Sequence, residues 1–301
     1  MGRSKPRQKI SFDRSTIDAF TDYLKKRTDE SLERLVSTPG SKIAYKHHLW
    51  SSISSPLTIR EFWTKQLEGI EWNEQLDSSI AEIIQRLASQ KECWLDAVLK
   101  YLPRGHVFNT TVYLIGGYDN VVWGEDVTLN LNFKKFQLDY RESVYYLIHE
   151  LAHAGYFKYR RMPNLANLKT LRGLLNSVKL LTHLEGMGVI SPFALRMKEN
   201  GLQDADYEAL LNEKETEARV HSYFSTLTSL ENEPNRKLQR EDYGIVDNFS
   251  SRPKRLWYVT GGHMALEIEE RYGTAKLRKF VRDGYQAFFK TYAQIEDPLS
   301  L

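Results

Sequence analysis

The N-terminal third of the chain places apolar side chains at the spacing of amphipathic helices. Ile17, Phe20 and Leu24 share one helical stripe, and the same spacing recurs among the apolar positions between residues 62 and 98. Pro103-Arg104-Gly105 then ends the pattern. We therefore predict an all-helical N-terminal part over residues 13–105, packed on the rest of the protein and preceded by a disordered basic tail over residues 1–12.

The pattern changes to that of β-strands between Val107 and Leu131. Three runs in this stretch are rich in β-branched and aromatic residues, and glycine-containing turns separate them. They predict a small antiparallel sheet. A helical pattern follows from about Tyr140 to Tyr159, and further helical patterns occupy most of the remaining chain. We therefore expect an α+β protein that is mostly helical, with residues 106–301 forming its core domain.

One of the later helical stripes contains a carboxylate. Leu174, Val178, Leu181 and Glu185 fall at positions i, i+4, i+7 and i+11, so all four lie on one face of a helix. A carboxylate on an apolar face costs free energy unless it is paired or coordinates a metal. This helix is expected to end near Ser191-Pro192, because proline interrupts helical hydrogen bonding.

Composition and charge narrow the class of protein. Lys and Arg number 42 against 39 Asp and Glu, and the two signs are interspersed, which is no nucleic-acid-binding footprint. No apolar run is long enough for a membrane span, and no signal-peptide segment follows the basic start. The single cysteine, Cys93, excludes an internal disulfide and a cysteine-based zinc cage. We expect a cytoplasmic protein without nucleic-acid or membrane partners, and the sequence leaves its oligomeric state open.

The candidate chemistry lies in the stretch His149-Glu150-Leu151-Ala152-His153. In a helix, two histidines four residues apart lie on one face, where both imidazoles can bind a single zinc ion. Glu150 then lies beside that metal. The surrounding residues are apolar, aromatic or small, so three ionisable groups lie in a helix that is buried on most sides. A chance match is the alternative, but burial of three such groups without a partner costs several kcal/mol.

A third protein ligand must come from elsewhere in the chain. A third histidine six residues after the second is absent, because Tyr159 stands there. Glu185 is the first candidate, since Gly186 follows it and permits a close backbone approach. A buried carboxylate paired with an arginine is the alternative for Glu185. The other candidate ligands are His183, Glu213, Glu217 and His221.

Two segments resemble a known family. The motif His149–His153, followed by Leu184-Glu185-Gly186-Met187, resembles the gluzincins, zinc metallopeptidases in which a downstream helix supplies a glutamate ligand. The segment Tyr258–Ala265 also looks like the tail of predicted zinc-dependent peptidases without a characterised substrate, as do the later Gly273 and Tyr292. The resemblance implies a zincin-like core with one Zn²⁺ per chain, held by His149, His153 and Glu185.

The resemblance also implies roles for other residues. Glu150 is implied as the general base, and Tyr258 or His263 as the donor that stabilises the oxyanion. Because the upstream strand edge binds the peptide in such enzymes, the candidate substrate contacts are Trp123, Leu129 and Leu131. For Trp123, packing is the favoured interpretation over a substrate contact.

These observations lead to one hypothesis and two rivals. The hypothesis is a zinc-dependent peptidase that acts on a peptide or protein substrate through a zinc-activated water. The first rival is a zinc hydrolase of a non-peptide amide or ester, because such a site does not specify the bond that is cleaved. The second is a zincin-fold binding protein without catalytic turnover.

Overall fold

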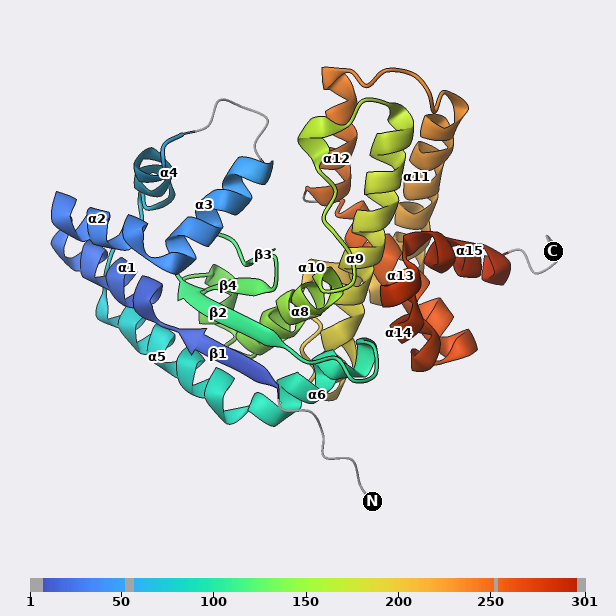
Figure 1. Ribbon diagram of the computed structural model, residues 1–301. Helices are drawn as coiled ribbons and strands as arrows, with labels where there is room; N and C mark the ends of the chain where they lie inside the picture. The colour runs from blue at the N-terminus through green and yellow to red at the C-terminus, as the bar shows by residue number, and fades with distance from the viewer. Residues whose placement is uncertain (1–7, 52–56, 252–253, 297–301) are drawn as a thin grey trace. The chain divides into compact units, whose positions relative to one another are not determined.

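The computed structural model describes residues 8–51, 57–251 and 254–296, and these residues are mostly helical with one small sheet (Figure 1). They divide into two compact units, residues 1–96 with 105–158 and residues 97–104 with 159–301. The division differs from the expected boundary at residue 105, because the N-terminal helices belong to the same unit as the sheet and the motif helix.

The first unit combines a sheet with helices on both of its sides (Figure 1). In chain order its elements are β1 (Lys9–Asp13), α1 (Ser15–Lys26), α2 (Asp29–Ser37), α3 (Pro39–Ser51), α4 (Ile59–Gln66), α5 (Glu74–Ser89), α6 (Lys91–Tyr101), β2 (Asn109–Ile115), β3 (Val121–Trp123), β4 (Asp126–Asn130), α7 (Lys134–Leu138) and α8 (Arg141–Phe157). The last residues of α6 belong to the second unit.

The sheet is mixed, with four described strands in the order β1-β2-β4-β3. Strands β1, β2 and β4 are parallel, and only β3 pairs antiparallel, with β4. The expected antiparallel arrangement is therefore wrong. The expected tail is also wrong from Lys9 onward, since Phe12 pairs with Val112 in the parallel ladder. Residues 1–7 of that tail lie outside the described residues.

Both faces of the sheet are covered. Leu114 and Ile115 are neighbours on β2, so their side chains point to opposite faces, and each is no more than 1% exposed. Helix α3 covers the Ile115 face, where Gly40 lies so close that an added methyl group would be 2.9 Å from the Ile115 side chain. Helix α8 packs against β3 and β4. A strand buried on both faces reads as a continuous apolar run, which matches the Val112–Ile115 stretch.

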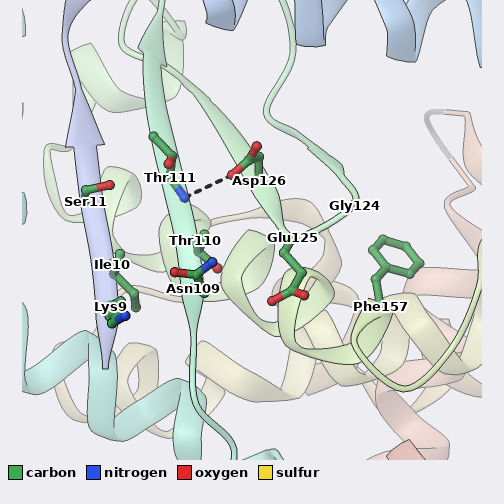
Figure 2. A pocket seen from close by; sticks show the side chains of 10 residues that line it. All are labelled: Lys9, Ile10, Ser11, Asn109, Thr110, Thr111, Gly124, Glu125, Asp126 and Phe157. Atoms are coloured by element: carbon green, nitrogen blue, oxygen red, sulfur yellow. Dashed lines mark hydrogen bonds between the residues drawn. The ribbon is translucent and has the colours of Figure 1, made fainter. Parts of the chain in front are cut away.

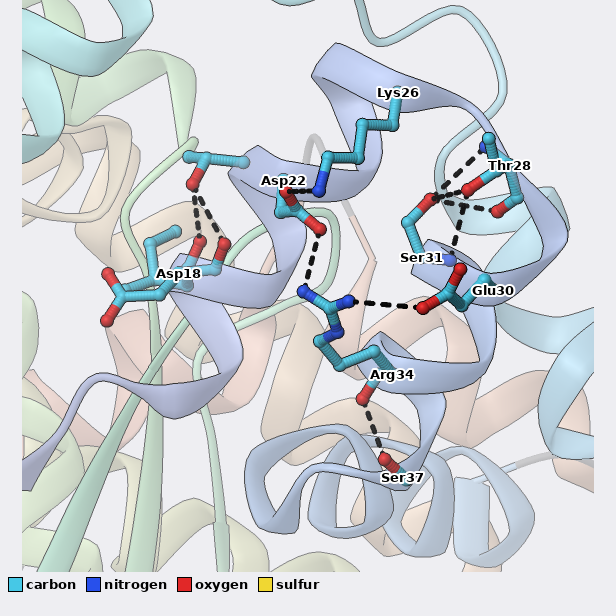
Figure 3. A network of polar contacts seen from close by, with 10 residues as sticks. Asp18, Asp22, Lys26, Thr28, Glu30, Ser31, Arg34 and Ser37 are labelled. Atoms are coloured by element: carbon cyan, nitrogen blue, oxygen red, sulfur yellow. Dashed lines mark hydrogen bonds and ion pairs between the residues drawn. The ribbon is translucent and has the colours of Figure 1, made fainter.

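Polar contacts at the surface join α1 to α2 (Figure 3). The Asp22 carboxylate accepts from Lys26 at 2.8 Å and from Arg34 at 3.1 Å. Thr28 caps α2 by a reciprocal arrangement with Ser31, in which each side chain bonds the backbone N–H of the other residue. Exposed ion pairs contribute little to stability. The helix cap and the apolar stripe therefore stabilise the α1–α2 segment more than these ion pairs do.

The second unit is helical throughout its described elements. These are η1 (Leu165–Asn167), α9 (Leu171–Lys198), α10 (Ala205–Leu211), α11 (Glu213–Asn232), η2 (Arg240–Tyr243), α12 (Gly244–Ser250), α13 (Leu256–Tyr272), α14 (Thr274–Asp283) and α15 (Tyr285–Glu296). Helix α9 continues through Pro192 instead of ending there. The Ser191 hydroxyl donates to the Met187 carbonyl at 2.7 Å, and both Ser191 and Pro192 are buried, so packing overrides the local preference to stop.

Helices α9 and α13 make their closest approach at two glycines. A Cβ atom added to Gly186 would lie 2.4 Å from the Gly261 carbonyl oxygen, and one added to Gly261 would lie 2.2 Å from the Thr182 carbonyl oxygen. No other residue type fits at either position without moving backbone. The two backbones are therefore in direct contact beside Glu185.

None of the helices in the described part of the chain has both the length and the apolar character needed to cross a lipid bilayer.

A half-buried histidine in the first unit makes stability depend on pH. The ring of His47 packs edge-on against Tyr118, whose hydroxyl is 3.1 Å from Nδ1. Burial, with the charge of neighbouring His48, lowers the pKa of His47 from 6.5 to about 4. The unfolded chain therefore binds more protons between these pH values, and the stability that the neutral ring contributes is lost as the pH falls through that window.

We expect the free energy of unfolding of the wild type to fall by about 2 kcal/mol more than that of His47→Gln between pH 6.5 and 4.5. The measurement is urea unfolding followed by circular dichroism at several pH values. Parallel pH curves for the two proteins would show that His47 is not kept neutral by the fold.

The glycine contact gives a second stability prediction. Gly186→Ala should lower the free energy of unfolding by about 2–3 kcal/mol, because the new methyl group meets rigid backbone. Gly173→Ala is the matched control on the same helix, since its nearest neighbour would be a Leu168 side-chain atom at 3.4 Å. The control should be neutral or stabilising, and equal losses in both variants would contradict the close-contact explanation.

Candidate metal centre

Helix α8 places both motif histidines on one of its faces, as the spacing predicts. The ring centroids of His149 and His153 are 4.4 Å apart, and the rings are nearly perpendicular. Most of α8 is buried, including its residues before and after the motif, so the prediction of a helix buried on most sides is confirmed. His153 is 6% exposed and His149 is intermediate.

Glu150 follows His149 on the same helix and is 7% exposed. A carboxylate at this depth is sheltered from water, which strengthens its interaction with any positive charge nearby and favours proton exchange with a bound molecule. Glu150 is therefore buried next to the candidate ligand His149 in the same helix.

Glu185 lies on α9 in a run of buried residues. It alone among residues 181–192 keeps intermediate exposure, so its carboxylate is at the margin of the apolar stripe instead of fully enclosed. Gly186 follows it at the contact with α13. This small residue lets α13 approach closely, as the sequence suggested.

His149, His153 and Glu185 form a group of side chains that could hold a metal ion. One ligand atom from each of the three lies within 4.8 Å of the other two. In a tetrahedral zinc site, bonds of about 2.0–2.2 Å place ligand atoms about 3.3–3.6 Å apart. Two imidazoles and one carboxylate form a ligand set used by catalytic zinc sites, with a fourth position left for water or substrate.

The rival third ligands lie elsewhere. His183 is fully buried, with its ring stacked on Phe288 at a centroid distance of 4.5 Å. Glu213, Glu217 and His221 are exposed on α11. Within the described residues, His149, His153 and Glu185 are the one group of three such side chains close enough to share a metal ion.

The two candidate oxyanion donors lie on different sides of α13. Burial raises the pKa of the Tyr258 hydroxyl, and the negative charge of Glu185 raises it further, which places Tyr258 in the electrostatic reach of that carboxylate. His263 instead packs edge-on against Tyr292, at a centroid distance of 6.0 Å. Five residues of helix turn by about 140° from one to the other, so the two side chains do not share a face.

The three candidate substrate contacts also differ, in this case in their exposure to solvent. Trp123 is 38% exposed on β3, which forms an edge of the sheet. Leu129 and Leu131 are fully buried, and Leu129 lies on the interior strand β4. Their side chains belong to the hydrophobic core in this structure, and helices α8 and α3 pack against β4. Only Trp123 of the three is accessible to a substrate.

Sequence reasoning did not identify two residues next to Tyr258. Arg255 directs its guanidinium over the Tyr258 ring, 3.6 Å from the centroid. The same guanidinium donates two hydrogen bonds to the buried carboxylate of Asp206, at 2.6 and 2.7 Å. Arg255 lies in a polar stretch and Asp206 at the start of α10, so no spacing rule links them.

A shallow pocket of about 670 Å³ lies where β1, β2 and β4 begin (Figure 2). It is lined by polar side chains, including Ser11, Thr111 and Asp126. The Asp126 carboxylate accepts a hydrogen bond from the Thr111 backbone N–H at 3.1 Å, as the dashed line in Figure 2 marks. This acid therefore ties β4 to β2, and none of the predicted site residues lines the pocket.

Comparison with known proteins identifies a family. A family model described as "Putative zinc dependent peptidase (DUF5700)" matches residues 32–296, which is most of the chain. No curated protein matches. No solved structure matches either.

Proposed function

We propose that this chain, which belongs to the DUF5700 family, is a zinc-dependent peptidase whose metal is held by His149, His153 and Glu185. The observation that carries the proposal is the convergence of two imidazoles and one carboxylate within 4.8 Å, in a chain whose family is described as zinc-dependent. The ligand set supports a place in the glutamate-ligand branch of the zincins.

Glu150 is proposed as the general base. A zinc ion bound by the three ligands would polarise a scissile carbonyl and lower the pKa of an adjacent water molecule towards about 7. Glu150 takes the proton of the attacking water and delivers it to the leaving amine, a role that its burial beside His149 supports. The Tyr258 hydroxyl is proposed to donate a hydrogen bond to the developing oxyanion. His263 is less suited to this role, because its ring packs against Tyr292.

The substrate is proposed to be a peptide in an extended conformation. Strand β3 is at the edge of the sheet and pairs with β4 on one side only among the described residues. An edge strand offers backbone N–H and C=O groups to which an extended peptide can add. Trp123 lies on this strand and is partly exposed, so its ring can contact a substrate side chain.

Metal binding tests the ligand assignment. Purified wild-type protein should contain one zinc per chain, and Glu185→Gln should lower zinc affinity by at least about 100-fold, because one of three protein ligands loses its charge. Glu217→Gln is the matched control, since this exposed glutamate is a rival ligand by sequence. The measurement is metal analysis with competition against a chelator. Equal affinities in the two variants would refute Glu185 as a ligand.

Cleavage of a peptide library tests the reaction. Glu150→Gln should lower kcat by about 10²–10⁴-fold with its zinc content unchanged, since only the proton acceptor is removed. Glu142→Gln is the control, because Glu142 lies on the same helix and is equally buried, at 7% exposure. Both variants are checked for folding by circular dichroism.

Two outcomes would count against the peptidase proposal. Equal cleavage by wild type and Glu150→Gln would exclude Glu150 as the base. No peptide cleavage by zinc-loaded wild type, with turnover of an ester or non-peptide amide instead, would reassign the substrate class.

A further inference from the structure

The start of helix α13 is held by a partly buried ion pair. Asp206 is 4% exposed, and its two carboxylate oxygens accept from Nε and Nη2 of Arg255 at 2.6 and 2.7 Å. Both bonds come from the planar fork of one guanidinium, which fixes the orientation of the plane as well as its position. Asp206 is itself anchored at the N-terminus of α10, where its backbone N–H donates to the Asp204 carboxylate at 3.0 Å.

The Arg255 backbone adopts an uncommon conformation. Its φ of 42° and ψ of 49° lie in the left-handed region, which is unfavourable for a residue with a side chain. Its carbonyl accepts hydrogen bonds from the backbone N–H groups of Tyr258 and Val259, each at 3.2 Å. Such strain persists only where the surrounding contacts determine the conformation, and here both the backbone and the side chain of Arg255 are held.

The fixed guanidinium lies over the ring of Tyr258. The distance from the guanidinium carbon to the ring centroid is 3.6 Å, which is a close stacking contact. Tyr258 lies three residues before Gly261, hence on the same side of α13 and about one turn away from the contact with Gly186. Burial raises the pKa of the Tyr258 hydroxyl. The negative charges of Glu185 and Asp206 raise it further, and the positive charge of Arg255 lowers it.

We propose that Arg255, anchored by Asp206, is a positioning residue that holds the Tyr258 ring, and with it the hydroxyl, in one orientation. The inference rests on the proposed function, in which Tyr258 is the oxyanion donor. A tyrosine side chain has only two rotatable torsions, so one flat contact on its face is enough to restrict the direction of the hydroxyl. A donor that is oriented before the substrate binds needs no reorganisation during the reaction.

The first experiment measures ring order without activity. 3-Fluorotyrosine is incorporated at position 258 alone, and the ¹⁹F NMR spectrum of the metal-free protein is recorded. The wild type should give one narrow resonance. Arg255→Lys keeps the charge but loses the planar fork, and it should give a broadened resonance or more than one, as should Asp206→Asn.

The control is Arg219→Lys. Arg219 donates to the carbonyl of Lys254, next to Arg255, and bonds Glu215, so it supports the same segment without a stacking contact to Tyr258. The control spectrum should keep a single narrow resonance. An unchanged single resonance in Arg255→Lys would overturn the positioning role, whether or not the protein cleaves peptides.

The second experiment is a double-mutant cycle on peptide cleavage. Arg255→Lys should lower kcat by about 10–100-fold with KM changed less than about threefold and zinc affinity within about twofold. In a Tyr258→Phe background the same substitution should cost less than about threefold, because its effect passes through the hydroxyl. Equal losses in both backgrounds would mean that Arg255 only stabilises α13, and would overturn the proposal.

The two experiments separate this inference from the proposed function. Wild type that binds zinc but cleaves no peptide would count against the peptidase, while the fluorine spectra would still decide whether Arg255 orients Tyr258. Active wild type with an unchanged Arg255→Lys spectrum would leave the peptidase standing and remove the positioning role.

Discussion

The direct contact between the backbones of α9 and α13 is the constraint on which the helical second unit depends. Gly186 and Gly261 meet where any Cβ atom would overlap a carbonyl group. Helices usually pack with their axes 8–10 Å apart, and small residues at the crossing allow the shortest approach. Because Glu185 precedes one glycine and Tyr258 lies one turn before the other, the crossing places a carboxylate and a phenol in the same neighbourhood. The proximity of this carboxylate and this phenol therefore depends on the absence of a side chain at both Gly186 and Gly261.

The second constraint is electrostatic. Helix α8 is buried along most of its length, yet it carries two imidazoles and a carboxylate within five consecutive residues. Burial of ionisable groups is costly unless each has a partner, and a divalent cation can serve all three at once. The Asp206–Arg255 pair solves the same problem differently, because the two opposite charges neutralise each other, and the guanidinium plane also stacks on Tyr258.

The arrangement of strands in the sheet could not be predicted from local sequence patterns. The alternation between residues 107 and 131 predicted strands at nearly the right positions, but neighbouring strands in the chain were assumed to pair antiparallel. In the structure β2 and β4 are parallel, and β1 joins from the far N-terminus. A five-residue run such as Lys9–Asp13, next to basic residues, carries little signal by itself, and its order comes from hydrogen bonds to a strand about a hundred residues away. The predicted helix end at Pro192 was wrong for a related reason, because the packing of α9 outweighs the local helix-breaking preference of proline.

The sequence by itself determined the motif helix, the two histidines on one face, the acid between them and Glu185 as the first candidate for a third ligand. These follow from short-range periodicity, which a helix obeys wherever it packs. Only the tertiary structure shows that Glu185 is the candidate ligand that groups with the two histidines, that the charge of Glu185 acts on the Tyr258 hydroxyl, and that Leu129 and Leu131 are core residues. It alone revealed Arg255 and Asp206. The physical reason is that these relations join residues far apart in the chain, where no spacing rule applies and the packing of whole elements sets the distances.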